Sequence, residues 1–196
     1  MAVVASPASI PTVIKKKDEL PGYDIKGVDD SRYSVVITEN DKPDPFALSP
    51  EMVQITNEVV APYRRNELRK RAKAIFDWMQ KNVPYDEAMK RRIESKEKGE
   101  YRGADYTLQD RAGVCGEQAV LYIAMARLAG LQAKYVSVKE DYTGKEVSHG
   151  CAGINADVGE FILVDPAYHQ FDIKHKKFEA WDDEKVRAVF RVWNKN

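Results

Sequence analysis

The sequence predicts an α+β fold, and two observations carry this prediction. Helical patterns occupy most of the chain between residues 50 and 130, and alternating or apolar strand patterns follow between residues 131 and 165. The last helical pattern, which begins at Cys115, is apolar on every side, as expected of a helix buried inside a protein. We therefore expect a buried helix that starts at Cys115 and packs against a small antiparallel sheet.

Length and composition narrow the class of protein. A chain of 196 residues is long enough for one sizeable core. The 31 Lys and Arg residues balance the 31 Asp and Glu residues, so the charge indicates no surface for nucleic acid. No apolar run is long enough to span a membrane, and two cysteines are too few for a disulfide framework. We expect a cytoplasmic protein that binds neither nucleic acid nor membrane.

Two regions are expected along the chain. Residues 1–45 are interpreted as an N-terminal arm with one possible strand in the alternating stretch RYSVVITE. Residues 46–196 are expected to form the main domain.

The main domain is predicted to begin with two helices. Ser49 is a good N-cap residue and Pro50 suits the first helical position, so the first helix should run to about Ala61. The second lies in NELRKRAKAIFDWMQKNVPY, where apolar residues recur at helical spacing until Pro84 ends the pattern.

The next two segments differ sharply in polarity. Residues 86–99 are almost all charged, and they form either an exposed helix or a loop. In the helix after Cys115, Glu117 and Arg127 are the only charged residues. Gly130 then suits the position just past a helix end.

Three strands are predicted after this helix, in LQAKYVSV, VSHGCAGIN and EFILVD. The last two form a hairpin through the short link ADVG. If the turn is centred on Asp157, His149 and Asp165 are directly opposed, with Cβ atoms about 5 Å apart on one face. The carboxylate can then hold the imidazole in a single tautomer.

A thiol, an imidazole and a carboxylate in this arrangement suit nucleophilic catalysis. Cys115 lies at a helix start, where unpaired N–H groups and the helix dipole lower the pKa of a thiol. His149 can take the thiol proton, and Asp165 can orient His149. Each residue alone also has a structural explanation, such as a small core residue for Cys115, and it is the combination that favours catalysis.

Four stretches of the chain resemble the transglutaminase-like superfamily: AIFDWMQKNVPYD (74–86), RAGVCGEQAVLYIAMARLAGLQAKYV (111–136), HGC (149–151) and FILVDPAY (161–168). The resemblance implies a papain-like α+β fold and acyl transfer through a thioester. It makes Cys115 the nucleophile, His149 the general base and then acid, and Asp165 the residue that orients His149.

Two further residues are candidates for the site. Gln109 is the oxyanion candidate, because papain-type enzymes place a glutamine six residues before the nucleophile, as here. Many relatives have tryptophan where this chain has Cys151, which we expect to face the active-site groove. A packing role for Cys151 and an oxidative link to Cys115 both remain open. His169 and His175 lie in a charged segment, and we expect both to be solvated.

The predicted activity is that of a cysteine hydrolase that cleaves a peptide or amide bond in a protein or peptide, without cofactor or metal. A protein-glutamine transglutaminase is the first alternative, in which an amine rather than water resolves the thioester. A noncatalytic protein-binding scaffold of the same fold is the second. A zinc site from Cys115, His149, Cys151 and His169 is chemically possible, but the spacing matches no zinc knuckle.

Overall fold

A computed structural model describes residues 13–15, 35–37, 44–95, 101–157 and 160–190. Within the N-terminal part, strands β1 (Val13–Lys15) and β2 (Val35–Ile37) form an antiparallel pair. β2 falls inside the predicted strand RYSVVITE, whereas β1 has no counterpart in the prediction. The rest of the predicted arm, up to residue 43, lies outside the described residues.

The first two helices are confirmed. α1 (Pro50–Val60) begins where Ser49 caps it, with the serine side chain accepting the Met52 N–H at 3.2 Å. α2 (Leu68–Asn82) ends two residues before Pro84, and it buries one apolar face that is formed by Ala72, Ile75, Phe76 and Met79.

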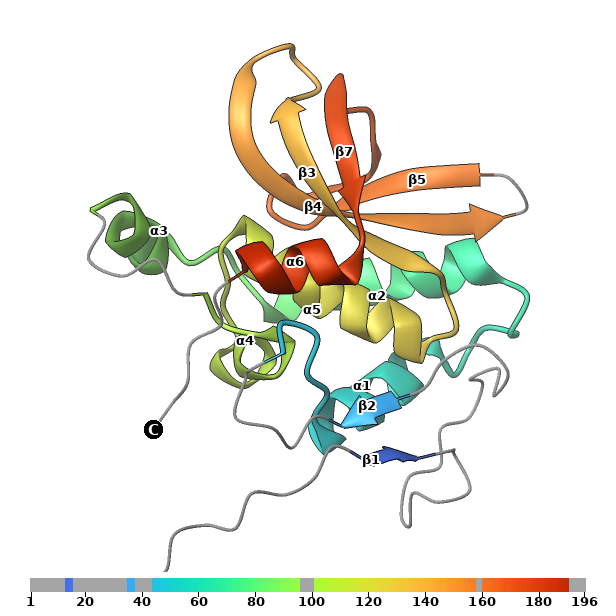
Figure 1. Cartoon of the computed structure of the whole chain (residues 1–196). Coiled ribbons are helices and arrows are strands. Elements are labelled where there is room, and N and C mark those ends of the chain that lie inside the picture. Colours follow the sequence, from blue (N-terminus) through green and yellow to red (C-terminus); the bar gives the residue numbers. More distant parts are fainter. Residues whose placement is uncertain (1–12, 16–34, 38–43, 96–100, 158–159, 191–196) are drawn as a thin grey trace, which may run out of the picture.

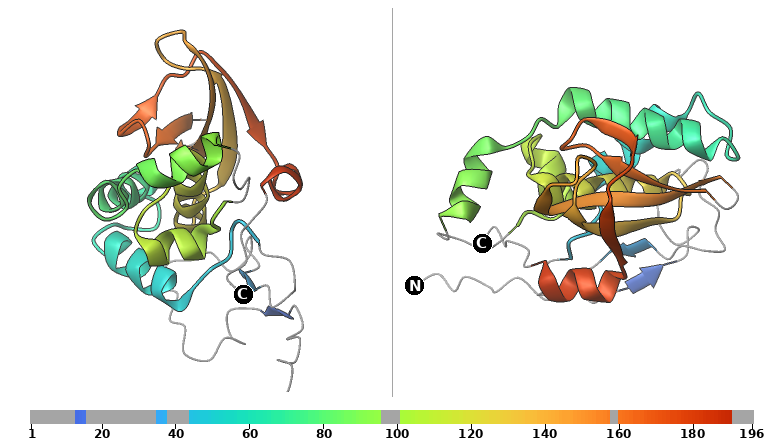
Figure 2. Two further views of the ribbon diagram at one scale, coloured as in Figure 1. Left: turned by 90° about the vertical axis from the view of Figure 1, so that its left-hand side faces the viewer. Right: turned by 90° about the horizontal axis from the view of Figure 1, so that it is seen from above.

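The charged segment after α2 contains an exposed helix. α3 (Glu87–Glu94) has no buried residue, and it stands apart from the other helices in Figure 1 and in the right-hand view of Figure 2. The rest of the charged segment, residues 96–100, lies outside the described part. α4 (Ala104–Asp110) follows without a sequence signal, because it is short and Arg111, rather than glycine, takes the left-handed position after it with φ 52°.

α5 (Cys115–Leu128) is the central buried helix, as predicted. Residues on every side of it are buried, from Gly116 through Met125. Its one acidic residue, Glu117, is fully buried and pairs with Arg102 at 2.8 Å. The helix packs against β3 and β4 of the sheet, and against α1, α2 and α4.

The sheet contains five strands in the order β6-β5-β4-β3-β7, all antiparallel. They are β3 (Ala133–Glu140), β4 (Glu146–Asp157), β5 (Glu160–Asp165), β6 (Gln170–Ile173) and β7 (Lys177–Trp181). Figure 1 and the left-hand view of Figure 2 show the sheet on one side of the molecule and α1, α2, α4 and α5 below it. The sequence predicted β3, β4 and β5, but not the charged and largely exposed β6, β7 or the final helix α6 (Asp183–Val189).

The register of the β4–β5 hairpin differs from the prediction. Ala152 pairs with Val164 and Asn155 with Phe161, so the turn is centred one residue later than expected. A bulge between Asn155 and Asp157 accompanies this change. The same register carried onward aligns Asp165 with Cys151, and His149 is therefore a diagonal neighbour of Asp165. A slip of two residues leaves both side chains on their original face, because side chains alternate with a period of two.

Among the described residues, the structure has no helix with the length and apolar character that crossing a membrane requires.

Candidate active site

Cys115 is the first residue of α5, and the loop before it is held by buried polar contacts. The Glu117 carboxylate accepts the backbone N–H of Val114 at 3.0 Å and the backbone N–H of Arg102 at 2.8 Å. Because Glu117 lies in the first turn of α5, these bonds fix the approach of the chain to the helix. The Cys115 side chain is left partly exposed.

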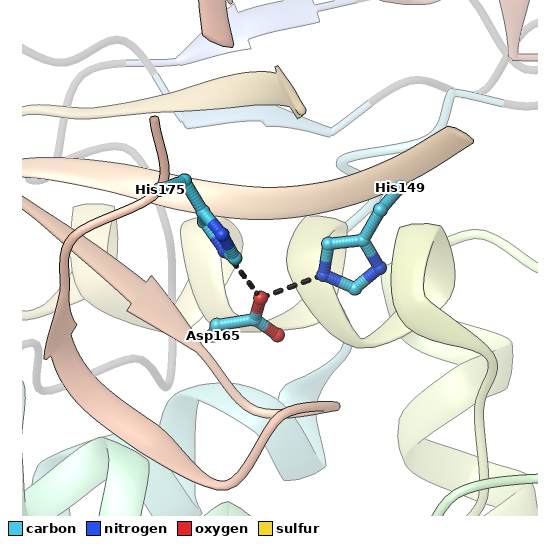
Figure 3. Close-up of side chains that lie close together, drawn as sticks. All are labelled: His149, Asp165 and His175. Carbon is cyan, nitrogen blue, oxygen red and sulfur yellow. Dashed lines mark hydrogen bonds and ion pairs between the residues drawn. The ribbon is translucent and has the colours of Figure 1, made fainter. Parts of the chain in front are cut away.

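His149 lies on β4, next to the point where β5 begins to pair with that strand. Its Nε2 atom is 2.6 Å from Oδ2 of Asp165, and only 8% of the His149 side chain is exposed (Figure 3). Since Nε2 is directed at Asp165, Nδ1 is the ring nitrogen that remains for the thiol of Cys115. The backbone N–H of Gly150, the next residue, hydrogen-bonds the Cys115 sulfur.

Asp165 ends β5 and is completely buried. Its Oδ2 atom contacts the Nε2 atoms of His149 and His175, and its Oδ1 atom accepts the backbone N–H of Tyr168 at 3.0 Å. Burial would raise the pKa of Asp165, but the hydrogen bonds from both imidazoles hold it below its usual value. The carboxylate therefore stays ionised beside His149.

The protonation of Cys115 and His149 is coupled through their hydrogen bond. Burial opposes a thiolate, but hydrogen bonding and charge from His149, with the N–H groups of Gly150 and Gly116, lower the pKa of Cys115. Burial also opposes an imidazolium, but hydrogen bonds to Asp165 and Cys115 raise the pKa of His149 to about 9. Both shifts favour a thiolate and imidazolium pair at neutral pH.

Gly150 leaves room on β4 for the side chain of Tyr135. A Cβ atom at this position would lie 2.0 Å from the Tyr135 hydroxyl, which also lies 3.3 Å from a Cβ built on Gly116. No side chain fits at such a distance, so the glycine in the HGC stretch has a steric role.

Tyr168 covers the His149 ring. The two rings are 4.7 Å apart at an interplanar angle of 72°, and Tyr142 packs edge-on against Tyr168. The Tyr168 hydroxyl in turn donates to the Asp141 carboxylate at 3.4 Å. These aromatic contacts restrict the imidazole and keep water from its bond with Asp165.

His175 was expected in solvent, and that expectation is wrong. Its side chain is completely buried, its Nε2 atom is 3.0 Å from Asp165, and its Nδ1 atom has no partner among the described residues (Figure 3). His175 lies two residues beyond the end of β6 and outside any strand, so no periodic pattern in the sequence points it inward. His169 is exposed, as expected, and hydrogen-bonds Gln80.

The donor set of His149, Asp165 and His175 is one that divalent transition metals accept, and its ligand atoms lie within 4.8 Å of one another. Both imidazole nitrogens, however, contact the same carboxylate oxygen at hydrogen-bond distances of 2.6 and 3.0 Å. Protons therefore account for the cluster without a metal ion.

Two candidates remain, and the register of the sheet places one of them, Cys151, opposite Asp165. Gln109 lies near the end of α4 with an exposed side chain. Cys151 is fully buried in a small apolar cluster with Val136, Leu163 and Ile173, and this burial raises the pKa of its thiol well above the usual value. Its surroundings fit the packing role.

Fold and site together define an α+β protein with a thiol at the start of a buried helix and an imidazole bound to a buried carboxylate. The family model described as the transglutaminase-like superfamily matches residues 53–189. The chain belongs to the transglutaminase-like superfamily, and the prediction made from its motifs is confirmed.

Three solved structures are similar to part of the chain. A candidate cysteine protease from Cytophaga hutchinsonii is 24% identical with a TM-score of 0.49, and the match covers 64% of this chain and 39% of that one. A candidate protease from Parabacteroides distasonis is 15% identical with a TM-score of 0.43, and the match covers 63% of this chain and 27% of that one. A TGase is 16% identical with a TM-score of 0.46, and the match covers 66% of this chain and 36% of that one. The matched region spans less than half the length of each. The comparison with curated proteins gives no match.

Proposed function

We propose that this chain is a cysteine hydrolase that cleaves a peptide or amide bond through a thioester on Cys115. One arrangement carries the proposal: His149 hydrogen-bonds both the Cys115 thiol and the buried carboxylate of Asp165. This order of nucleophile, base and orienting acid is the arrangement that nucleophilic acyl transfer uses on unrelated folds.

In the acylation step, the Cys115 sulfur attacks the carbonyl carbon, a C–S bond forms, and the carbonyl electrons move to oxygen. The intermediate then collapses, the C–N bond breaks, and the imidazolium of His149 gives its proton to the departing amine. In the second step, neutral His149 takes a proton from water while that water attacks the thioester. The carboxylic acid leaves, and the sulfur and the imidazole return to their first state.

Hydrolysis is favoured over crosslinking by the exposure of the nucleophile. Cys115 is partly exposed, so water can reach a thioester on its sulfur. Transfer to a lysine amine requires that water be excluded. We propose a protein or peptide as the substrate, and a cytoplasmic location because a reducing compartment preserves the free thiols of Cys115 and Cys151.

The test is incubation of the full chain with a peptide library, with and without a primary amine, followed by mass spectrometry. Cleaved or deamidated peptides that form only when Cys115 is present support hydrolysis, and Cys115→Ala is the matched control. Amine-bearing products would indicate a transglutaminase instead. Unchanged peptides under both conditions would favour the noncatalytic scaffold.

A further inference from the structure

An acyl-transfer site needs two donors for the developing oxyanion, and the candidate site so far supplies one. The backbone N–H of Cys115, at the open end of α5, is the first. Gln109 was the sequence candidate for the second, but its side chain is exposed on α4. The segment that follows α2 offers a different donor.

Tyr85 is held beside the loop that leads into Cys115. It forms a parallel bridge with Gly113, in which Gly113 donates to the Pro84 carbonyl and Asp86 donates to the Gly113 carbonyl, each at 3.2 Å. A Cβ atom on Gly113 would lie 2.9 Å from a side-chain carbon of Thr107, so glycine at this position lets the loop pack closely against α4.

Side chains of α5 strengthen the same attachment. The Gln118 side chain donates to the Val83 carbonyl at 2.8 Å. Arg102 pairs with Asp86 at 2.7 Å and with Glu117 at 2.8 Å. Residues on both sides of Tyr85 are therefore fastened to the first turn of the helix that carries the nucleophile.

The Tyr85 hydroxyl reaches the nucleophile itself. Its side chain is half-buried, and its phenol oxygen lies close enough to the backbone N–H of Cys115 for the two groups to interact. Burial, together with the nearby charge of the thiolate, raises the pKa of Tyr85 to about 12. The phenol consequently keeps its proton at neutral pH and is available as an O–H donor.

We propose that Tyr85 is a catalytic residue whose hydroxyl donates a hydrogen bond to the oxyanion, next to the bond from the backbone N–H of Cys115. The inference rests on the proposed acyl-transfer function. When the sulfur attacks, the carbonyl oxygen takes the place of the phenol oxygen beside the Cys115 N–H, and the phenol O–H turns to the same oxygen. Tyr85 keeps its proton throughout, because the oxyanion returns its electrons to the carbonyl when the C–N bond breaks.

The experiment compares two reactions of Cys115 in the full chain. Acylation by p-nitrophenyl acetate passes through an oxyanion and releases p-nitrophenolate, whereas alkylation by iodoacetamide displaces iodide without one. Tyr85→Phe removes only the hydroxyl, and Tyr63→Phe, in the turn after α1, is the matched control. Thermal unfolding of each variant checks that the fold is kept.

We expect Tyr85→Phe to slow acylation about 100-fold, at the low end for loss of one oxyanion donor. Alkylation should stay within about twofold of the parent chain, because it uses only the thiolate. Equal acylation rates in the parent and Tyr85→Phe chains would overturn the assignment of Tyr85. Equal losses in acylation and alkylation would also overturn it, since Tyr85 would then act on the thiolate. A parent chain that is alkylated but never acylated would contradict the proposed function itself.

Discussion

In the proposed mechanism, Cys115 and His149 form the reactive centre because each stabilises the charge of the other. Burial opposes both charges, so the pair depends on Asp165, whose carboxylate accepts three hydrogen bonds. One of these donors, His175, has no counterpart among the residues proposed from sequence. It contacts the same carboxylate oxygen as His149, with the two ring centres 5.9 Å apart, and we propose that it positions Asp165 without touching the substrate.

The thiolate of Cys115 should be detectable without a substrate. The pKa of Cys115 is lowered from its ordinary value of 9.0, and the pKa of Cys151 is raised by burial. Iodoacetamide should therefore label Cys115 at neutral pH well before Cys151, as peptide mass mapping would measure. In His149→Ala, the midpoint of the labelling rate against pH should move upward. Equal, slow labelling of both cysteines would contradict an activated nucleophile.

Asp165→Asn should impair catalysis while the fold remains. An amide can present its NH₂ group to His149, which selects the wrong tautomer, so we expect activity to fall by about 10³-fold or more. The imidazolium of the parent chain loses its proton near pH 9. Without the carboxylate, this loss moves to lower pH, so the alkaline limb of the activity profile should shift down. Circular dichroism provides the control for folding, and a fully active variant would remove Asp165 from the site.

At the level of secondary structure, the start of α5 is positioned by a buried charge cluster. Glu117 and Arg102 are both buried, and Asp86 pairs with the same guanidinium nitrogen of Arg102 as Glu117 does. The cluster links α5 to the segment between α2 and α3. Without it, both the nucleophile and Tyr85 would lose their shared support.

Glu117→Gln should reduce both stability and reactivity. Loss of one partner leaves a buried cation incompletely paired, at a cost of about 3 kcal/mol in the free energy of unfolding. Cys115 alkylation at pH 7 should slow several-fold, because the approach to α5 is less well held. Ser49→Ala, which removes the cap of α1, is the control: it should cost about 1 kcal/mol and leave alkylation unchanged. Unaltered alkylation in Glu117→Gln would show that the cluster serves stability alone.

Over the whole molecule, the fold is closed by contacts between distant parts of the chain. Phe46 is buried, with the Arg127 guanidinium 4.6 Å from its ring centre. Asp44 pairs with Arg187 near the C-terminal helix at 3.1 Å. Asp44 makes this contact although it lies just before the predicted boundary between residues 45 and 46, and we propose that the domain includes Asp44.

Truncation can test this boundary. A chain that begins at Asp44 should unfold with a free energy within about 1 kcal/mol of the full chain and keep the reactive thiol. A chain that begins at Leu48 lacks Phe46 and should lose about 3 kcal/mol, the cost of emptying an aromatic site in a core. Denaturant unfolding measures both. A large loss of unfolding free energy in the chain that begins at Asp44 would mean that residues 1–43 belong to the domain.

The sequence alone determined the local features of this protein. The buried helix from Cys115, the caps of α1 and the stop before Pro84 follow from periodicity and from backbone chemistry, which depend on neighbouring residues. That His149 and Asp165 lie on the same face of the sheet was predictable for the same reason, even though the observed strand register differs from the predicted one by two residues. The family could also be recognised, because its motifs are contiguous in the chain.

Only the tertiary structure brought His175 to Asp165 and Tyr85 to Cys115. Each contact joins two segments that no periodic pattern in the sequence connects. The elements β6, β7 and α4 are too short or too charged for their sequence patterns to predict them. The burial of Cys151 and the exposure of Gln109 also follow from the tertiary structure, since the exposure of a side chain depends on elements that pack from elsewhere in the chain. The shifted pKa values of the site arise from these contacts, because a charge is tuned by what surrounds it in space.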